Sequence, residues 1–383
     1  MKVTGASIVV VGTGTFATAV CRALARSLTR DTTVHVLGRT STAVSATCAL
    51  GSAHARLAGA PVKFRPVVTA LHLTTDLRPL LAQLSPDVVV VCASLQPPAE
   101  SRQTTTQWSA LLRQAGFGVT VPLQAALVER IAADYADVND SPILLNACFP
   151  DAVNPLLSAR GLPVLCGIGN VAALALGIQD RLEIDDPHRV QLLAHHAHLH
   201  RPDDPSMEAR AWVDGQPLDD VADLLTMMRT CPRDVVNEVS AWAAGPLITA
   251  VINDEPYVGH LPGPLGLPGG YPVLVTGRSV TLRLPPGTSP QAAVDWNQRA
   301  ATLDGVQIAS DGCLTFTPAA LAALHQFWPQ APGTVAVDAV AQLRADLLNL
   351  RAALRRRTAD GHPESLTRVD NQHLPSHSKE LAC

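Results

Sequence analysis

The 383-residue sequence lacks the features that mark several common classes of protein. Its net charge is −4 and no basic run occurs before the C-terminal tail, so we expect no nucleic-acid partner. No apolar run reaches about 18 residues free of polar or charged side chains, and the N-terminus shows neither a basic segment nor a cleavage site. The sequence therefore predicts no membrane span, no signal peptide and a cytoplasmic location.

The eight cysteines form no C-x-x-C pair and are scattered along the chain. Several lie in apolar segments, where cysteine behaves as a small hydrophobic residue. This distribution indicates a reducing compartment and not a disulfide framework. Hydrophobic residues make up 47% of the chain and charged residues 16%, so we expect a globular protein, and the length predicts two domains.

A glycine turn near the N-terminus is the most informative motif. The apolar run 8–11 leads into Gly12 and Gly14, Ala17 occupies the third small position, and an apolar stripe predicts a helix that reaches about Leu28. Gly12 allows the tight turn, Gly14 leaves room for a pyrophosphate, and Ala17 lets the helix pack on the sheet. The motif predicts dinucleotide binding. The residues expected to contact the cofactor at this turn are Gly12, Thr13, Gly14, Thr15 and Phe16.

The end of the second predicted strand indicates which dinucleotide binds. NAD-binding proteins usually carry an acidic residue there, which binds the ribose 2′-hydroxyl. Gly38 has no carboxylate that would repel a 2′-phosphate, and Arg39, Thr40 and Ser41 supply a cation and two hydroxyls. We therefore expect NADP(H) as the cofactor, with NAD(H) as the alternative.

Strands and helices alternate through the first 155 residues. The run 88–93 is apolar on both faces, as in a central parallel strand, and a second buried strand, 143–145, ends at Asn146. This alternation predicts an α/β fold with a doubly wound parallel (Rossmann) sheet over residues 1–155. Ligands bind such sheets at the carboxyl ends of the strands, so we also expect the cofactor to contact Ala93, Ser94 and Asn146.

The second half of the chain does not continue the regular alternation of strands and helices. We expect residues 156–354 to form an α+β substrate domain and residues 355–383 to form a disordered tail. The segment 190–200 reads as a strand, whose alternation would place three of its four histidines on one face. That face suits acid–base catalysis, a metal site or a structural cluster. The four histidines are His195, His196, His198 and His200.

The order of these segments over residues 5–328 resembles the lactate/malate dehydrogenase superfamily. The matching segments are the glycine turn, the strand 88–93 with the loop after it, Asn146, the turn 167–170, His196, the helical segment 240–243 and the strand 269–273. The resemblance implies NAD(P)-dependent hydride transfer to a small-molecule carbonyl, and an assembly of two or four identical chains.

By position, the resemblance also implies roles for several polar side chains. His196 would be the proton donor or acceptor, and Arg102 or Arg113 would polarise the carbonyl oxygen. These arginines lie in the segment 95–118, whose closure would exclude water from the site. The residues expected to contact the substrate are Asn146, Asn170, His196 and Ser240.

Two charges of the family pattern are missing. Ala172 and Ala175 stand where the family has an aspartate that orients the histidine and an arginine that binds the substrate carboxylate. Without that bidentate arginine, 2-keto acids lose their main contact. We therefore expect a carbonyl or imine substrate other than lactate or malate, with Asp151 and Asn154 as candidates to replace the orienting aspartate.

Other functions fit parts of the same pattern. An imine or opine-type reductase, or an isomerase that oxidises its substrate transiently, needs no carboxylate-binding arginine. A catalytically silent NADP-binding sensor would tolerate both lost charges. The superfamily also includes NAD- and metal-dependent glycosidases, and Cys148 or Cys166 with His196 could imitate their metal ligands. The favoured prediction is an enzyme without a metal.

Overall fold

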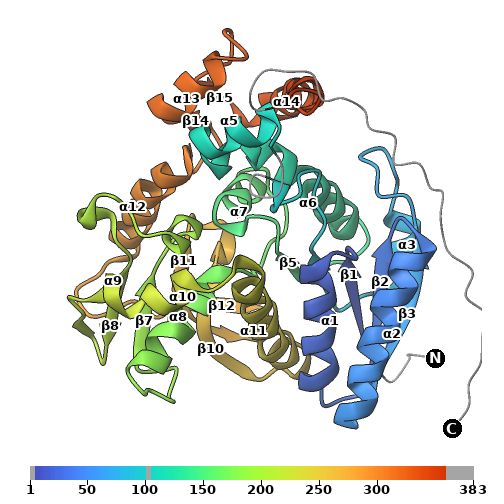
Figure 1. Ribbon diagram of the computed structural model, residues 1–383. Coiled ribbons are helices and arrows are strands. Elements are labelled where there is room, and N and C mark those ends of the chain that lie inside the picture. The colour runs from blue at the N-terminus through green and yellow to red at the C-terminus, as the bar shows by residue number, and fades with distance from the viewer. Residues whose placement is uncertain (1–4, 101–104, 359–383) are drawn as a thin grey trace, which may run out of the picture.

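The computed structural model describes residues 5–100 and 105–358. Its main sheet is parallel and has the strand order β3-β2-β1-β4-β5-β6. Figure 1 labels β1, β2, β3 and β5 of this sheet. The strands are β1 (Ala6–Val11), β2 (Thr32–Gly38), β3 (Val62–Val68), β4 (Val88–Val91), β5 (Leu144–Asn146) and β6 (Cys166–Gly167). This order, with a crossover from β1 to β4, is that of a doubly wound dinucleotide-binding sheet, so the predicted fold class is confirmed.

The valine run of β4 shows why this sheet needs two covered faces. All four side chains are fully buried, and successive residues belong to different hydrophobic clusters. Val89 and Val91 join the cluster that contains α3, α5, α6 and α7, whereas Val88 and Val90 join the cluster that contains α1, α2 and α11. The helices of the first half are α1 (Thr15–Ser27), α2 (Ser41–Ala58), α3 (Arg78–Leu84), α5 (Gln107–Ala115), η1 (Phe117–Thr120), α6 (Val121–Ala136) and α7 (Pro150–Ala159).

The second half contains three small antiparallel sheets with the orders β7-β8-β9, β10-β11-β12 and β13-β14-β15. Its strands are β7 (Val190–Leu193), β8 (Arg210–Val213), β9 (Gln216–Pro217), β10 (Pro256–Pro262), β11 (Gly270–Thr276), β12 (Ser279–Leu282), β13 (Val306–Ile308), β14 (Leu314–Phe316) and β15 (Thr334–Val335). Its helices are α8 (Asn170–Arg181), η2 (His196–Leu199), η3 (Pro205–Met207), α9 (Val221–Leu224), α10 (Thr226–Thr230), α11 (Arg233–Asn253), η4 (Pro264–Gly266), α12 (Pro290–Ala301), η5 (Thr302–Asp304), α13 (Pro318–His325), η6 (Val337–Ala339) and α14 (Val340–Leu354).

The apolar helix α11 packs on α1 (Figure 1). Within the described part of the chain it is the one helix whose length and composition would let it cross a membrane, and half of its apolar window is buried inside the protein. A side chain at Gly245 would collide with Ser27 of α1, so glycine permits the close approach of the two helices. The apolar character of α11 is therefore explained by packing in the core.

The expected strand over residues 190–200 is wrong in its second half. Strand β7 ends at Leu193, and the histidines continue into the 3-10 turn η2. The His198 side chain causes this change, because its Nδ1 accepts a 2.8 Å hydrogen bond from the backbone N–H of His195. Such local side-chain bonds compete with a strand ladder. The alternation that would place His196, His198 and His200 on one face therefore does not exist.

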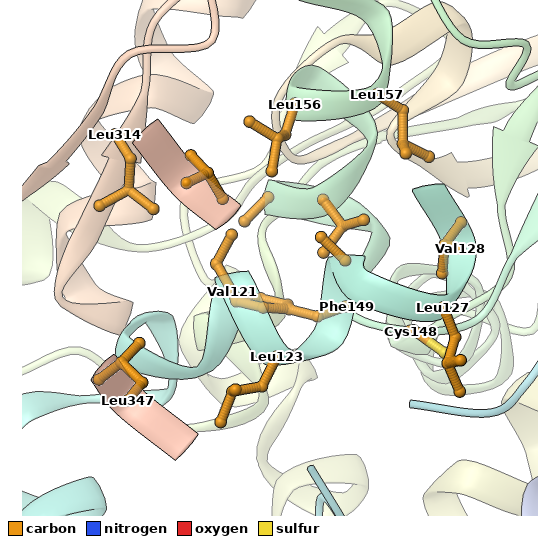
Figure 2. Close-up of a cluster of buried hydrophobic side chains, with 14 of the residues drawn as sticks. Val121, Leu123, Leu127, Val128, Cys148, Phe149, Leu156, Leu157, Leu314 and Leu347 are labelled. Atoms are coloured by element: carbon orange, nitrogen blue, oxygen red, sulfur yellow. The ribbon is translucent and has the colours of Figure 1, made fainter. Parts of the chain in front are cut away.

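The C-terminal part of the described chain returns to the first half. Elements β13, β14, α13 and α14 share one hydrophobic cluster with α5, α6 and α7. Figure 2 shows Leu123 of α6, Phe149 before α7, Leu314 of β14 and Leu347 of α14 gathered in this cluster. The domain boundary at residue 155 stays a prediction. It did not include the packing of these C-terminal elements against helices of the first half. Arg357, in the predicted tail, accepts a backbone bond from Gln107, and residues 359–383 lie outside the described ranges.

We expect Leu347→Ala to lower the free energy of unfolding by about 2–5 kcal/mol, because it removes a fully buried side chain and leaves a cavity. Asn349→Ala, at an exposed position of the same helix, is the control and should change stability by less than about 0.5 kcal/mol. Urea denaturation followed by circular dichroism measures both. Equal, small effects would show that α14 does not contribute to the main core.

Candidate functional site

The glycine turn between β1 and α1 has the shape that a phosphate site requires. Gly12 has φ +125°, and a Cβ there would lie 3.3 Å from the carbonyl carbon of Cys92, at the end of β4. Gly14 precedes the first turn of α1 and is exposed, and a Cβ placed on it would meet no described atom within 4 Å. The N-cap residue provides no side-chain hydrogen bond to this helix. Its first N–H groups are therefore available to an anion at the end of the helix.

The end of β2 lies beside the glycine turn. A Cβ on Gly38 would lie 2.7 Å from Thr13 Cγ2 and 2.6 Å from Val44 Cγ2, so an acidic side chain does not fit there without movement. Arg39, Thr40 and Ser41 are exposed next to it. The structure thus brings together the two parts of the predicted cofactor site, including Thr15 and Phe16 in the first turn of α1.

The ends of β4 and β5 complete this edge of the sheet. Gly12 adjoins Ala93, and the Ser94 hydroxyl donates to the carbonyl of Gln96. Asn146 lies at the end of β5 as expected, but it is fully buried. Its amide donates to Asn154 and to the Cys148 carbonyl and accepts from the Cys148 N–H. Asn146 shapes the loop before α7 with these bonds, and its contact with a ligand stays a prediction.

His196 has the carboxylate partner that the sequence did not identify. Its Nδ1 lies 3.0 Å from Oδ2 of Asp304, the last residue of η5. Asp151 contacts the same residue differently, because its Oδ1 accepts the backbone N–H of His196 at 2.9 Å. The other candidate, Asn154, bonds to Asn146 and Gly263. Of these three residues, Asp304 is the one that contacts the His196 ring, so it replaces Asp151 and Asn154 as the candidate to orient it.

The electrostatics of this pair favour charge on both groups. Burial tends to raise the pKa of the Asp304 carboxyl, but the imidazoles of His196 and His195 outweigh it and hold that pKa well below its usual range. Burial lowers the pKa of His196, yet Asp304, together with Asp151, produces a net increase. The His196 side chain is 28% exposed, and its Nε2 has no hydrogen-bond partner within the described residues. That nitrogen can exchange a proton with a ligand.

Two phenylalanine rings hold the His196 imidazole in place. Phe117 stacks on it at a centroid distance of 5.2 Å, and Phe149 meets it edge-on at 5.1 Å. Phe149 has φ 49° and precedes Pro150, a conformation that costs about 1–3 kcal/mol for a bulky residue. The preceding residue, Cys148, donates its thiol to the Ala93 carbonyl at 3.2 Å. This link places the histidine next to the strand ends.

The other residues that the sequence analysis named lie on α8, α11 and α5, or outside the described residues. Ser240 of α11 donates to Oδ1 of Asn170, at the start of α8, at 2.8 Å, so these two predicted substrate residues lie together. Ala172 and Ala175, further along α8, are buried. Arg113 is exposed on α5, and Arg102 lies outside the described residues.

Residues 95–100, at the start of the segment expected to close over the site, are hydrogen-bonded to arginines at the end of α14 and just after it. Arg355, just after α14, binds both carboxylate oxygens of Glu100 at 2.6 Å, and Arg351 donates to the Leu95 carbonyl and to Gln96. Bidentate arginine–carboxylate pairs fix geometry. In addition, much of the segment is the helix α5, whose Trp108 is fully buried. Closure over a ligand stays a prediction.

The histidines do not form a metal site in the described ranges, where no group of three or more His, Cys, Asp or Glu side chains could hold an ion. His198 is buried, and its Nε2 contacts the Met207 carbonyl at 2.8 Å. Burial raises the pKa of the Cys148 thiol to about 12 and also raises the pKa of Cys166. Neither thiol belongs to a group of three or more potential metal ligands within the described residues.

Comparison with solved structures identifies the same architecture. Malate dehydrogenase from Salinibacter ruber is 13% identical, with a TM-score of 0.50, and the match covers 78% of this chain and 95% of that one. Lactate dehydrogenase from Eimeria maxima, solved with NADH and oxamate, is 12% identical, with a TM-score of 0.50 and coverage of 79% and 92%. The expected resemblance is confirmed at the level of the fold. No protein-family model and no curated protein matches the sequence.

We expect the stability contributed by the Asp304–His196 pair to depend on pH. The raised pKa of His196 stabilises the fold below about 6.5 and the lowered pKa of Asp304 does so above about 3.9. Asp304→Asn should therefore destabilise most between these values, and less once the pH rises above the pKa of folded His196. Urea denaturation at pH 5.5 and 8.5 measures the difference. The same loss at both values would contradict a charged pair.

Proposed function

We propose that this chain is an NADP-dependent oxidoreductase that transfers hydride between NADPH and the carbonyl of a small molecule, with His196 as the proton donor and acceptor. The proposal rests on one observation: two features lie at the same edge of a doubly wound sheet. One is the glycine turn before α1, where no side chain caps the helix, and the other is His196, whose ring contacts the Asp304 carboxylate. The fold shared with malate and lactate dehydrogenases supports it. A cytoplasmic location and a homo-oligomer belong to the same proposal.

The residues at the strand ends fit a phosphorylated dinucleotide. The turn from Gly12 to Thr15 would hold the pyrophosphate at the N-terminus of α1. Arg39, Thr40 and Ser41 would hold the 2′-phosphate, because they are exposed beside a position where an acidic side chain does not fit. NADPH bound there would supply hydride to the carbonyl carbon.

His196 would supply the proton. The ionised Asp304 keeps the ring oriented through Nδ1 and raises its pKa, so a proton is available at Nε2 near neutral pH. After reduction of the carbonyl, the Asp304 carboxylate would stabilise His196 until it regains a proton from water. Phe117 and Phe149 would prevent rotation of the ring during this exchange.

The surroundings of α8 argue against 2-keto acids as substrates. Ala175, which stands where the resemblance calls for a carboxylate-binding arginine, is buried in a hydrophobic cluster with Val171 and Leu174. A substrate without a carboxylate next to its carbonyl needs no such arginine. Imines and hydroxyl groups that are oxidised transiently share this property, so imine reduction and isomerisation are the related alternatives.

A silent NADP-binding sensor is less well supported. Loss of the family's aspartate motivates that alternative, but Asp304 supplies an equivalent carboxylate at 3.0 Å from the histidine ring. The carboxylate whose loss would favour a silent protein is therefore present, supplied by a different element.

We expect Arg39→Ala to weaken NADPH binding about 10- to 100-fold, because it removes a charge-assisted contact with the 2′-phosphate, and to leave NADH binding unchanged. Arg56→Ala, which removes another exposed arginine of the same region, should change neither. Isothermal titration calorimetry with both cofactors measures the affinities. A parallel loss for NADH and NADPH would contradict the assigned 2′-phosphate contact.

We expect His196→Gln to lower kcat for NADPH oxidation by about 10²- to 10⁴-fold, because general acid catalysis is lost. The affinity for NADPH should not change, and His72→Gln, at an exposed position, should retain full activity. The assay follows NADPH absorbance against a panel of carbonyl and imine substrates. Binding of NADPH without turnover of any substrate would favour the sensor, and a product at the redox level of its substrate would indicate an isomerase.

A further inference from the structure

A second histidine shares the carboxylate that supports His196. Nδ1 of His195 lies 3.2 Å from Oδ2 of Asp304, and Nδ1 of His196 lies 3.0 Å from the same oxygen. The two rings differ in their surroundings, because His195 is completely buried whereas His196 reaches solvent. Phe149 packs against both rings. One carboxylate oxygen therefore connects an exposed proton carrier with a buried imidazole.

The charge on Asp304 decides which nitrogen of His195 carries the proton. Nδ1 could accept the Ala197 N–H at 3.3 Å or donate to Asp304, but it cannot do both. A lone pair 3.2 Å from an ionised carboxylate oxygen would be repelled by it, whereas an N–H at that position would be attracted to it. We therefore assign the proton to Nδ1. Nε2 is then a buried lone pair, and it has no partner within the described part of the chain.

Such an arrangement is unfavourable for a residue that only fills space. A buried polar atom without a partner costs about 1–3 kcal/mol, and an apolar side chain of similar size would avoid that cost. Among the described residues, the carboxylate that the His195 ring contacts is that of Asp304. The contact with that carboxylate is the one through which this histidine can act on His196.

We propose that His195 is a positioning residue that donates its Nδ1–H to Asp304 and thereby sets how tightly His196 holds its proton. The proposal rests on the role of His196 proposed above. In this proposal His195, which precedes η2, acts through its contact with Asp304. Three groups act directly on the His196 charge: Asp304 from η5, Asp151 from α7 and Arg233 from α11. Of these, Asp304 contacts the ring, so a donor to the same oxygen changes the proton affinity most directly.

The direction of the effect follows from the shared oxygen. A donated hydrogen bond withdraws charge from Oδ2, so the carboxylate attracts the His196 proton less strongly. Without that bond the pKa of His196 rises, and the imidazolium becomes a weaker acid toward the substrate. Removal of His195 and removal of Asp304 should therefore shift the pKa of His196 in opposite directions.

Three substitutions test this. His195→Leu removes the donor, and His195→Gln keeps an amide but places its nitrogen near the position of Nε2. His195→Asn places an amide nitrogen near the position of Nδ1 and so retains the donor. We expect Leu and Gln to raise the pKa of His196 and to lower kcat about three- to tenfold. The His195→Asn variant should return the pKa of His196 and kcat toward the wild-type values.

The primary readout is an NMR pH titration of the His196 ring in histidine-labelled full-length protein, which requires neither cofactor nor turnover. If His195→Leu does not fold, the comparison of Asn with Gln still decides. An unchanged His196 pKa in both Leu and Gln, or an Asn variant shifted as far as Gln, would overturn the proposal. If the pKa responds as expected but no carbonyl is reduced, the positioning role stands and the proposed function fails.

Discussion

The contact between the Asp304 carboxylate and the His196 ring is the interaction on which the site depends. It joins two segments 108 residues apart. Asp304 is held by the turn between α5 and η1, where any side chain at Gly116 or Gly118 would collide with the Asp304 carbonyl. The acid–base group therefore requires the correct packing of α5, η1, η2 and η5 together. A local error in any of these elements would separate the histidine from its carboxylate.

Asp304 supplies a carboxylate to the histidine from a different element than the resemblance implies. The start of α8 carries alanines at the two positions and packs into a hydrophobic cluster. A carboxylate contacts the histidine ring from η5, whereas the arginine of α8, Arg181, lies in the last turn of that helix. In the function proposed above, acid–base chemistry would use a carboxylate from η5, and substrate binding would not use a charge at position 172 or 175.

Local patterns predicted much of the fold, whereas long-range packing determined what they missed. The glycine turn and the valine run of β4 follow from short local patterns, and both form as expected. The strand assigned over the histidines failed because one imidazole, that of His198, bonds to the backbone locally. Asp304 carries no local signal, since an aspartate at the end of a short turn has the sequence of an ordinary surface loop. The packing of α13 and α14 against helices of the first half also has no local sequence signal.

The central claim is that a phosphorylated dinucleotide binds at the strand ends with its reactive end beside His196. The most direct measurement is an NMR titration of histidine- and glycine-labelled protein with NADPH. We expect saturable shifts of the Gly12 and Gly14 amides and of the His196 ring at the same concentrations, with His325 of α13 unchanged. Shifts of the glycine amides without a shift of the His196 ring would show that the bound cofactor does not reach the histidine. No saturable shift with either NADPH or NADH would contradict the account as a whole.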